Sequence, residues 1–198
     1  MKIAVLAWGS LIWDRRELAI AEDFRPCGPH LPVEFCRVSG DGRLTLVIDE
    51  TFGASCLTYS AFSAIGDLNG ALQNLWIREG SQDEKLPRDV RAHGRVGFVD
   101  VASGNQSDRA MERHPKAVAT IEAWVRANGF DAAIWTALAS NFSEPDKAAG
   151  PFSVKAAIRY LETLGAPKLN PALGYIRSAP AEVQTPVRTA VNARWPER

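Results

Sequence analysis

The sequence has few cysteines, no excess of either charge and no long apolar run. Its three cysteines form no Cys-x-x-Cys pair, so we expect neither a disulfide framework nor a cysteine-based zinc site. Lys plus Arg and Asp plus Glu both number 23, a balance that argues against nucleic-acid or membrane partners. No window approaches the roughly 18 apolar residues of a membrane-spanning helix. Because the N-terminal apolar run lacks a signal-peptide cleavage site, we expect a cytoplasmic protein.

The signatures of metal and cofactor sites are also missing. The three histidines show no His-x-x-x-His or Glu-x-x-His spacing, so we expect no metal. Neither G-x-G-x-x-G nor G-x-x-x-x-G-K-[ST] occurs, so we expect no nucleotide cofactor. The chain does have enough apolar residues to form one hydrophobic core, since 46% of its 198 residues are hydrophobic. This content and length predict a single domain over 1–198. No pattern indicates an oligomeric state.

Hydrophobic periodicity predicts an α+β fold. An Asp-Gly turn at 40–42 between two β-rich runs predicts a hairpin. The predicted strands cover 3–8, 33–39, 43–49, 56–62, 94–101 and 132–138. The predicted helices cover 14–21, 67–80, 115–128, 152–164 and 185–191. Since the strands cluster early and the helices late, we expect a small mixed β-barrel or curved sheet with flanking helices. The polar segment 81–93 is predicted to be a mobile loop that covers a site.

The first strand ends in an unusual way. Its apolar run from Ile3 to Trp8 stops at Gly9-Ser10. A buried strand that ends at glycine leaves backbone N–H groups free, with no Cβ to keep a ligand away. Successive free amides attract a carboxylate or phosphate. We therefore predict that Gly9, Ser10 and Leu11 line an active site; the alternative is a simple strand-end turn.

One carboxylate falls on the apolar face of the first long helix. That face consists of Leu68, Ala71, Leu72, Leu75 and Trp76. Glu79 follows Leu75 by four residues and Trp76 by three, which places it near the middle of the face, whereas Gln73 and Arg78 are expected to point elsewhere. A buried carboxyl there is suited to proton transfer near neutral pH. The alternative is a solvated Glu79, or one paired with an arginine for structural reasons.

Other residues are candidates for contact with a substrate. Arg37 and Arg43 flank the predicted hairpin, and their guanidinium groups suit a substrate carboxylate, although structural pairing is the alternative for each. Trp8 and Trp13 are candidates for pocket walls. Ser10 lacks the G-x-S-x-G frame and has no evident histidine partner, which argues against a serine hydrolase.

Two stretches resemble a known family. The first is Ala7-Trp8-Gly9-Ser10-Leu11-Ile12-Trp13, which resembles the Tyr-Gly-Ser-Leu-(Ile/Met)-Trp signature of the γ-glutamylcyclotransferase superfamily, especially its glutathione-degrading ChaC-type branch. The second is Leu75-Trp76-Ile77-Arg78-Glu79-Gly80, which resembles the family segment that carries the catalytic glutamate. Their order and separation match the family, and the resemblance extends to about Val101.

The resemblance implies a fold and a reaction. The fold is a compact α+β domain with a small mixed β-barrel and a cavity at one end. In the reaction, the α-amino group of a γ-glutamyl amine or peptide attacks its own γ-carbonyl and releases 5-oxoproline and a free amine. The amides of Gly9, Ser10 and Leu11 would bind the α-carboxylate, and Glu79 would shuttle the proton without metal or cofactor. The alternative is a non-catalytic member that binds a small anionic ligand or serves as an interaction module.

Two departures from the family pattern argue against glutathione itself as the substrate. Trp8 replaces the usual tyrosine before Gly-Ser and so removes a phenol hydroxyl. The aromatic residue, commonly tyrosine, that often follows the glutamate is also missing, since Ser81-Gln-Asp-Glu-Lys comes next.

Overall fold

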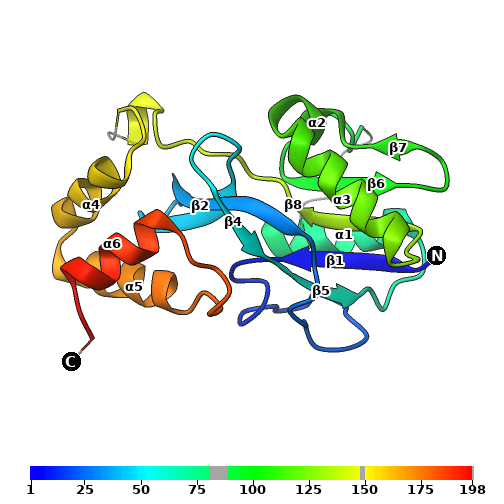
Figure 1. The fold of residues 1–198 in the computed structure, drawn as a ribbon, viewed down its shortest axis with the longest axis horizontal. Coiled ribbons are helices and arrows are strands. Elements are labelled where there is room, and N and C mark those ends of the chain that lie inside the picture. Colours follow the sequence, from blue (N-terminus) through cyan, green and yellow to red (C-terminus); the bar gives the residue numbers. More distant parts are fainter. Residues whose placement is uncertain (81–88, 148–149, 198) are drawn as a thin grey trace.

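The computed structural model describes residues 1–80, 89–147 and 150–197 (Figure 1). The predicted loop over 81–93 therefore falls largely outside the described residues. The described strands are β1 (Ile3–Ala7), β2 (His30–Val38), β3 (Leu44–Ile48), β4 (Ala54–Leu57), β5 (Tyr59–Phe62), β6 (Val96–Asp100), β7 (Asn105–Gln106) and β8 (Ala132–Thr136). The described α-helices are α1 (Leu68–Glu79), α2 (Asp108–Arg113), α3 (Pro115–Ala127), α4 (Val154–Thr163), α5 (Ala166–Arg177) and α6 (Pro186–Arg194).

The described strands form two sheets, and the α+β class is confirmed. The larger sheet is mixed, in the order β5-β1-β8-β6-β7, with β1 parallel to β8 and antiparallel to β5. The smaller sheet is antiparallel, in the order β3-β2-β4. Within the described ranges the strands close no barrel, so the barrel form of the expected fold is not seen there. The strand predicted over 56–62 is instead divided at Thr58 into β4 and β5, which belong to different sheets.

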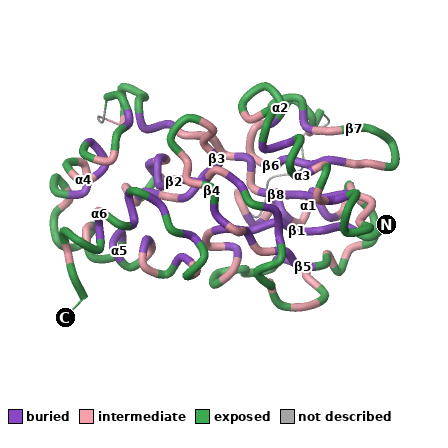
Figure 2. The backbone as a smooth tube through the Cα atoms, viewed as in Figure 1, coloured by how far each residue is buried: buried purple, intermediate pink, exposed green. Residues whose placement is uncertain are grey.

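The side chains of strand β1 are buried on both sides of the larger sheet. Ile3 and Val5 face the cluster that includes the apolar side of α1. Ala4 and Leu6 face the opposite cluster, which α3 and the smaller sheet share. Alternation along a strand sends successive side chains to opposite faces, so an uninterrupted apolar run is what a doubly covered strand requires. The burial pattern follows this arrangement (Figure 2), with β1 buried along its whole length.

Several helices begin where the sequence signals place them. Asp67 caps α1 by accepting a hydrogen bond from the Gly70 N–H at 2.7 Å. Thr185 caps α6 in the same way, accepting from the Arg188 N–H at 3.2 Å. Proline occupies the first turn of α3 and α6, where no N–H is needed.

The short helix predicted over 14–21 is wrong. The segment forms turns and a single bridge between Ile20 and Ser63. Two of its backbone groups bond to α1: the Asn74 side chain accepts from the Ala19 N–H at 2.8 Å and donates to the Glu17 carbonyl at 2.9 Å. The Ala21 N–H donates to the Phe62 carbonyl of β5, so these groups bond outside the segment rather than within a helix.

Two helices at the C-terminal end pack on the smaller sheet, α5 against β3 and α6 against β2. The helix α4 packs on α5 and α6 (Figure 1). The buried Arg188 guanidinium holds the α5–α6 connection by donating to four carbonyls at 2.5–3.3 Å. The helix α5 is not among the predicted elements, and it contains Pro171.

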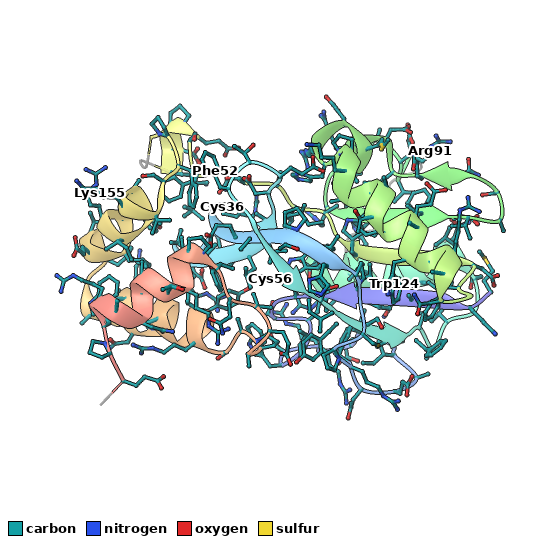
Figure 3. The ribbon with its side chains drawn as sticks, in the orientation of Figure 1. Cys36, Phe52, Cys56, Arg91, Trp124 and Lys155 are labelled. Carbon is teal, nitrogen blue, oxygen red and sulfur yellow. The ribbon has the colours of Figure 1, made fainter. Side chains whose placement is uncertain are left out.

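All three cysteines are free. Cys36 lies on β2 and Cys56 on β4 (Figure 3), and both are buried. Cys27 is exposed. None of the helices in the described ranges has the length and apolar character needed to cross a membrane.

Candidate active-site pocket

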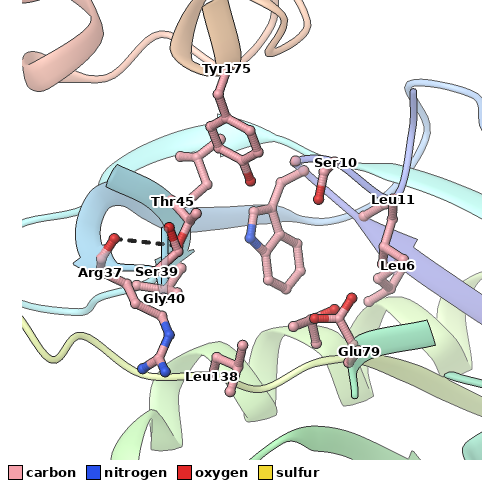
Figure 4. A pocket seen from close by; sticks show the side chains of 16 residues that line it. Leu6, Ser10, Leu11, Arg37, Ser39, Gly40, Thr45, Glu79, Leu138 and Tyr175 are labelled. Carbon is pink, nitrogen blue, oxygen red and sulfur yellow. Dashed lines mark hydrogen bonds between the residues drawn. The ribbon is translucent and has the colours of Figure 1, made fainter. Parts of the chain in front are cut away.

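A cavity of about 240 Å³ opens where β1 ends. Its walls come from the loop after β1, the β2–β3 hairpin, the last residue of α1, the end of β8 and the helix α5 (Figure 4). The lining residues are Leu6, Ala7, Trp8, Gly9, Ser10, Leu11, Arg37, Ser39, Gly40, Thr45, Leu46, Val47, Glu79, Thr136, Leu138 and Tyr175. Elements separated widely in the sequence thus build one concave site.

The loop after β1 forms one wall of the cavity. Two turn hydrogen bonds curl it: the Ile12 N–H donates to the Gly9 carbonyl at 3.0 Å, and the Asp14 N–H donates to the Ser10 carbonyl at 2.7 Å. Among the described residues, no group accepts a hydrogen bond from the backbone N–H groups of Gly9, Ser10 or Leu11. Three consecutive amides without an acceptor beside a cavity suit an anion, and anion binding by this loop stays a prediction.

Glu79 lines the same cavity, on the side of Ser10 (Figure 4). Its side chain is only 9% exposed, and one oxygen lies 2.6 Å from Nη1 of Arg78. The carboxylate therefore lines the cavity and also meets an arginine. Its role in proton transfer stays a prediction. The contact with the guanidinium holds the carboxylate in a defined orientation.

The expectation that Arg78 points away from the buried face is wrong, because its side chain is only 7% exposed. Residues spaced by four and then three form a row along a helix, so Ala71, Leu75 and Arg78 make one row. The neighbouring row ends in Glu79, which brings the two charged side chains together at the end of α1. The signal was present in the sequence, since Arg78 follows Leu75 by three residues.

Arg78 also joins α1 to the loop after β1. Its Nη2 donates to the Asp14 carbonyl at 2.6 Å and to the Ser10 hydroxyl at 3.2 Å. Its Nε has no hydrogen-bond partner among the described residues. One guanidinium thus fixes the carboxylate of Glu79 relative to the free amides of the loop.

Tyr175 enters the cavity from α5, and sequence reasoning missed it. Its hydroxyl points toward the space that Ser10 and Glu79 also face (Figure 4). A Cβ placed on Gly9 would lie 3.6 Å from that hydroxyl. Burial raises the pKa of Tyr175, a hydrogen bond with the Ser10 side chain opposes this shift, and the charge of Glu79 adds to it. The phenol therefore stays protonated at neutral pH and is available as a donor.

The two predicted arginines differ in position. Arg37 lines the cavity across from Ser10 and Glu79, and its Nη1 donates to the Ala139 carbonyl at 2.7 Å (Figure 4). Arg43 is not among the lining residues: it pairs with Asp41 at 2.7 Å, and its guanidinium lies 5.0 Å from the centre of the Tyr175 ring.

The two predicted tryptophans also differ. Trp8 is buried in the lining, together with Leu11. Trp13 is not a lining residue, and its ring meets the Tyr175 ring edge-on at 5.5 Å.

The cavity suits proton transfer and anion binding better than a serine nucleophile. The Ser10 hydroxyl accepts from Arg78, and no histidine is present among the lining residues to act as its base. Within the described ranges no three His, Cys, Asp or Glu side chains lie close enough together to hold a metal ion.

Comparisons of the chain with protein-family models, curated proteins and solved structures find no match.

Proposed function

We propose that the chain is a γ-glutamylcyclotransferase-type enzyme that converts a small γ-glutamyl amine or peptide into 5-oxoproline and a free amine. One observation carries the proposal: a buried carboxylate lines the same small cavity as three consecutive residues whose backbone N–H groups have no acceptor among the described residues. The likeness of both stretches to the family's motifs supports it as well.

In the proposed reaction the amides of Gly9, Ser10 and Leu11 bind the substrate α-carboxylate. The Glu79 carboxylate takes a proton from the α-ammonium group, and the freed nitrogen attacks the γ-carbonyl carbon. The carbonyl electron pair moves to oxygen and then re-forms the double bond as the C–N bond to the leaving group breaks. Glu79 returns its proton to the departing amine and takes the second proton from the ring nitrogen, which leaves the single N–H of 5-oxoproline. The released amine accepts that second proton from Glu79 and leaves as an ammonium ion, so the carboxylate is regenerated. Holding amine and carbonyl together in a small cavity supplies much of the rate gain.

A second function has a specific observation in its favour. Arg78 lies 2.6 Å from Glu79 and neutralises its charge. In a non-catalytic protein the same ion pair would serve to shape an anion-binding pocket, with the carboxylate fixed in place and no proton transferred.

The first prediction separates the two functions. Incubation with a panel of γ-glutamyl amines and γ-glutamyl peptides should release 5-oxoproline, and Glu79→Gln should reduce the rate by roughly 10² or more, because the amide cannot accept the proton. The matched control is Glu122→Gln on the exposed face of α3, which should leave the rate unchanged.

Equal rates for wild type and Glu79→Gln would rule out the proton shuttle. A wild type that binds γ-glutamyl compounds and releases no 5-oxoproline would favour the binding protein.

A further inference from the structure

Tyr175 reaches the pocket in a fixed orientation. The rings of Trp13 and Phe35 both meet the Tyr175 ring edge-on. Their centres lie 5.5 Å and 6.4 Å from the centre of the Tyr175 ring, respectively. The Arg43 guanidinium lies 5.0 Å from the ring centre, within the range of a cation–π contact. With contacts on several sides, the ring holds its hydroxyl at one place above the loop after β1.

The Ser10 side chain is oriented in the same pocket by Arg78. A guanidinium donates only, so the Ser10 oxygen accepts from Arg78 Nη2 at 3.2 Å. Burial raises the pKa of Tyr175, and this outweighs the lowering effect of the Ser10 side chain. The phenol therefore has a proton to donate to an acceptor in the pocket.

The cavity supplies the place for that acceptor. The Tyr175 hydroxyl lies 3.6 Å from where a Gly9 Cβ would be, beside the free amides of Gly9 and Ser10. An anion held by those amides comes within reach of the phenol. The missing side chain of Gly9 leaves room for the anion between loop and ring.

We propose that Tyr175 is a substrate-binding residue whose phenol donates a hydrogen bond to the carboxylate held by the amides of Gly9, Ser10 and Leu11. The identification of that anion as the α-carboxylate of a γ-glutamyl compound rests on the proposed function. The phenol that Trp8 lacks relative to the family signature is thus supplied from α5, a helix in the last third of the chain.

The test is calorimetric binding of 5-oxoproline and L-glutamate to the full chain, wild type and Tyr175→Phe. The variant removes one oxygen and keeps the ring with its contacts to Trp13, Phe35 and Arg43. A lost hydrogen bond to a charged group should raise the dissociation constant roughly tenfold or more. The neutral 5-oxoprolinamide, which has no carboxylate, should bind both proteins alike. The protein control is Tyr59→Phe, whose hydroxyl donates to Glu182 outside the pocket.

Equal affinity of wild type and Tyr175→Phe for 5-oxoproline and L-glutamate would overturn the assignment. So would a wild type that binds neither, or an equal loss of the carboxylate and the amide ligand, which would show a general disturbance of the pocket. The proposed function is judged separately. If the wild type releases no 5-oxoproline and yet binds carboxylates through Tyr175, the reaction is wrong and the anion contact stands.

Discussion

The pairing of Arg78 with Glu79 determines how the end of α1 behaves. Both side chains are nearly inaccessible to solvent, so removal of one partner leaves a buried charge without compensation. The same guanidinium is bonded to the loop after β1. Stability and the geometry of the site therefore depend on one side chain.

The second prediction concerns Arg78→Gln. The unpaired carboxylate should lower the free energy of unfolding by about 3–5 kcal/mol, measured by denaturant titration, and the misplaced Glu79 should lose most 5-oxoproline release. Arg126→Gln, which breaks the exposed pair with Glu122, is the control and should cost about 0–1 kcal/mol. If the two variants are equally stable, the buried pair does not hold the site together.

The third prediction concerns Gly9→Ala. The added Cβ would meet its nearest neighbours at 3.6–3.9 Å, which is ordinary contact, so the melting temperature should change little. The methyl group would nevertheless stand between the loop, the Leu46 side chain and the Tyr175 hydroxyl, where the anion is expected. Weaker 5-oxoproline binding with an unchanged fold, by calorimetry and circular dichroism, is the expected result. Unchanged binding would place the anion elsewhere.

At the scale of elements, local signals predicted most of the structure. The caps at Asp67 and Thr185 and the proline at position 115 gave helix starts that the structure confirms. The apolar runs near 3–8 and 132–138 predicted the strands β1 and β8, whereas their parallel pairing was not predicted.

What failed depended on distant contacts. Asn74, which lies in α1, bonds to two backbone groups of the segment predicted as a helix over 14–21. The helix α5 was missed, and Pro171 inside it reads as a helix breaker. Burial of Ala172, Leu173 and Ile176 against the core outweighs that local cost.

The fourth prediction tests the close packing of β6 on β8. Gly97 lies opposite Trp135 in this pair, and a Cβ on Gly97 would come within 2.4 Å of the indole ring. Because Trp135 is fully buried and cannot move aside, Gly97→Ala should destabilise the protein by about 1–3 kcal/mol in a denaturant titration. Gly66→Ala, which meets no atom within 4 Å, is the control. Equal stability of the two variants would contradict the tight contact.

At the scale of the whole molecule, the site is assembled from nearly the full length of the chain. The loop after β1 and the end of α1 carry the residues that motif spacing identified, Gly9, Ser10, Leu11 and Glu79. Tyr175 comes from α5, beyond the part of the chain that resembles the family. A short sequence motif can identify the residues of one loop or one helix end. A side chain that tertiary packing brings into the site, such as Tyr175, has no motif around it in the sequence.

A buried carboxyl joins the smaller sheet to the last helix. Glu34 on β2 is fully buried, and its oxygens accept from the Phe35 N–H at 2.7 Å and from the Val187 N–H, in the first turn of α6, at 3.3 Å. Burial raises the pKa of Glu34 above its ordinary value of 4.5, against the lowering effect of hydrogen bonds that include the Thr185 side chain. The folded protein therefore holds this proton more tightly than the unfolded chain does.

The fifth prediction follows from the sign of that shift. The stabilising contribution of Glu34 should be complete below pH 4.5 and should be lost as pH rises through the raised pKa of the folded state. Relative to Glu34→Gln, which does not titrate, wild type should thus lose free energy of unfolding with rising pH, at no more than about 1.4 kcal/mol per pH unit. The test is the slope of the free energy of unfolding against pH, because the amide substitution itself changes this free energy by the same amount at every pH.

Glu182→Gln provides the control for the direction of that slope. The hydrogen bond from Tyr59 lowers the pKa of Glu182 at the surface. The free energy of unfolding of the wild type should therefore rise slightly relative to that of this variant as pH rises from the acid side. Opposite slopes for the two variants, measured by denaturant titration across the acid range, are expected. Parallel curves for wild type and Glu34→Gln would mean that Glu34 titrates alike in the folded and unfolded states, and that the link between β2 and α6 does not depend on its proton.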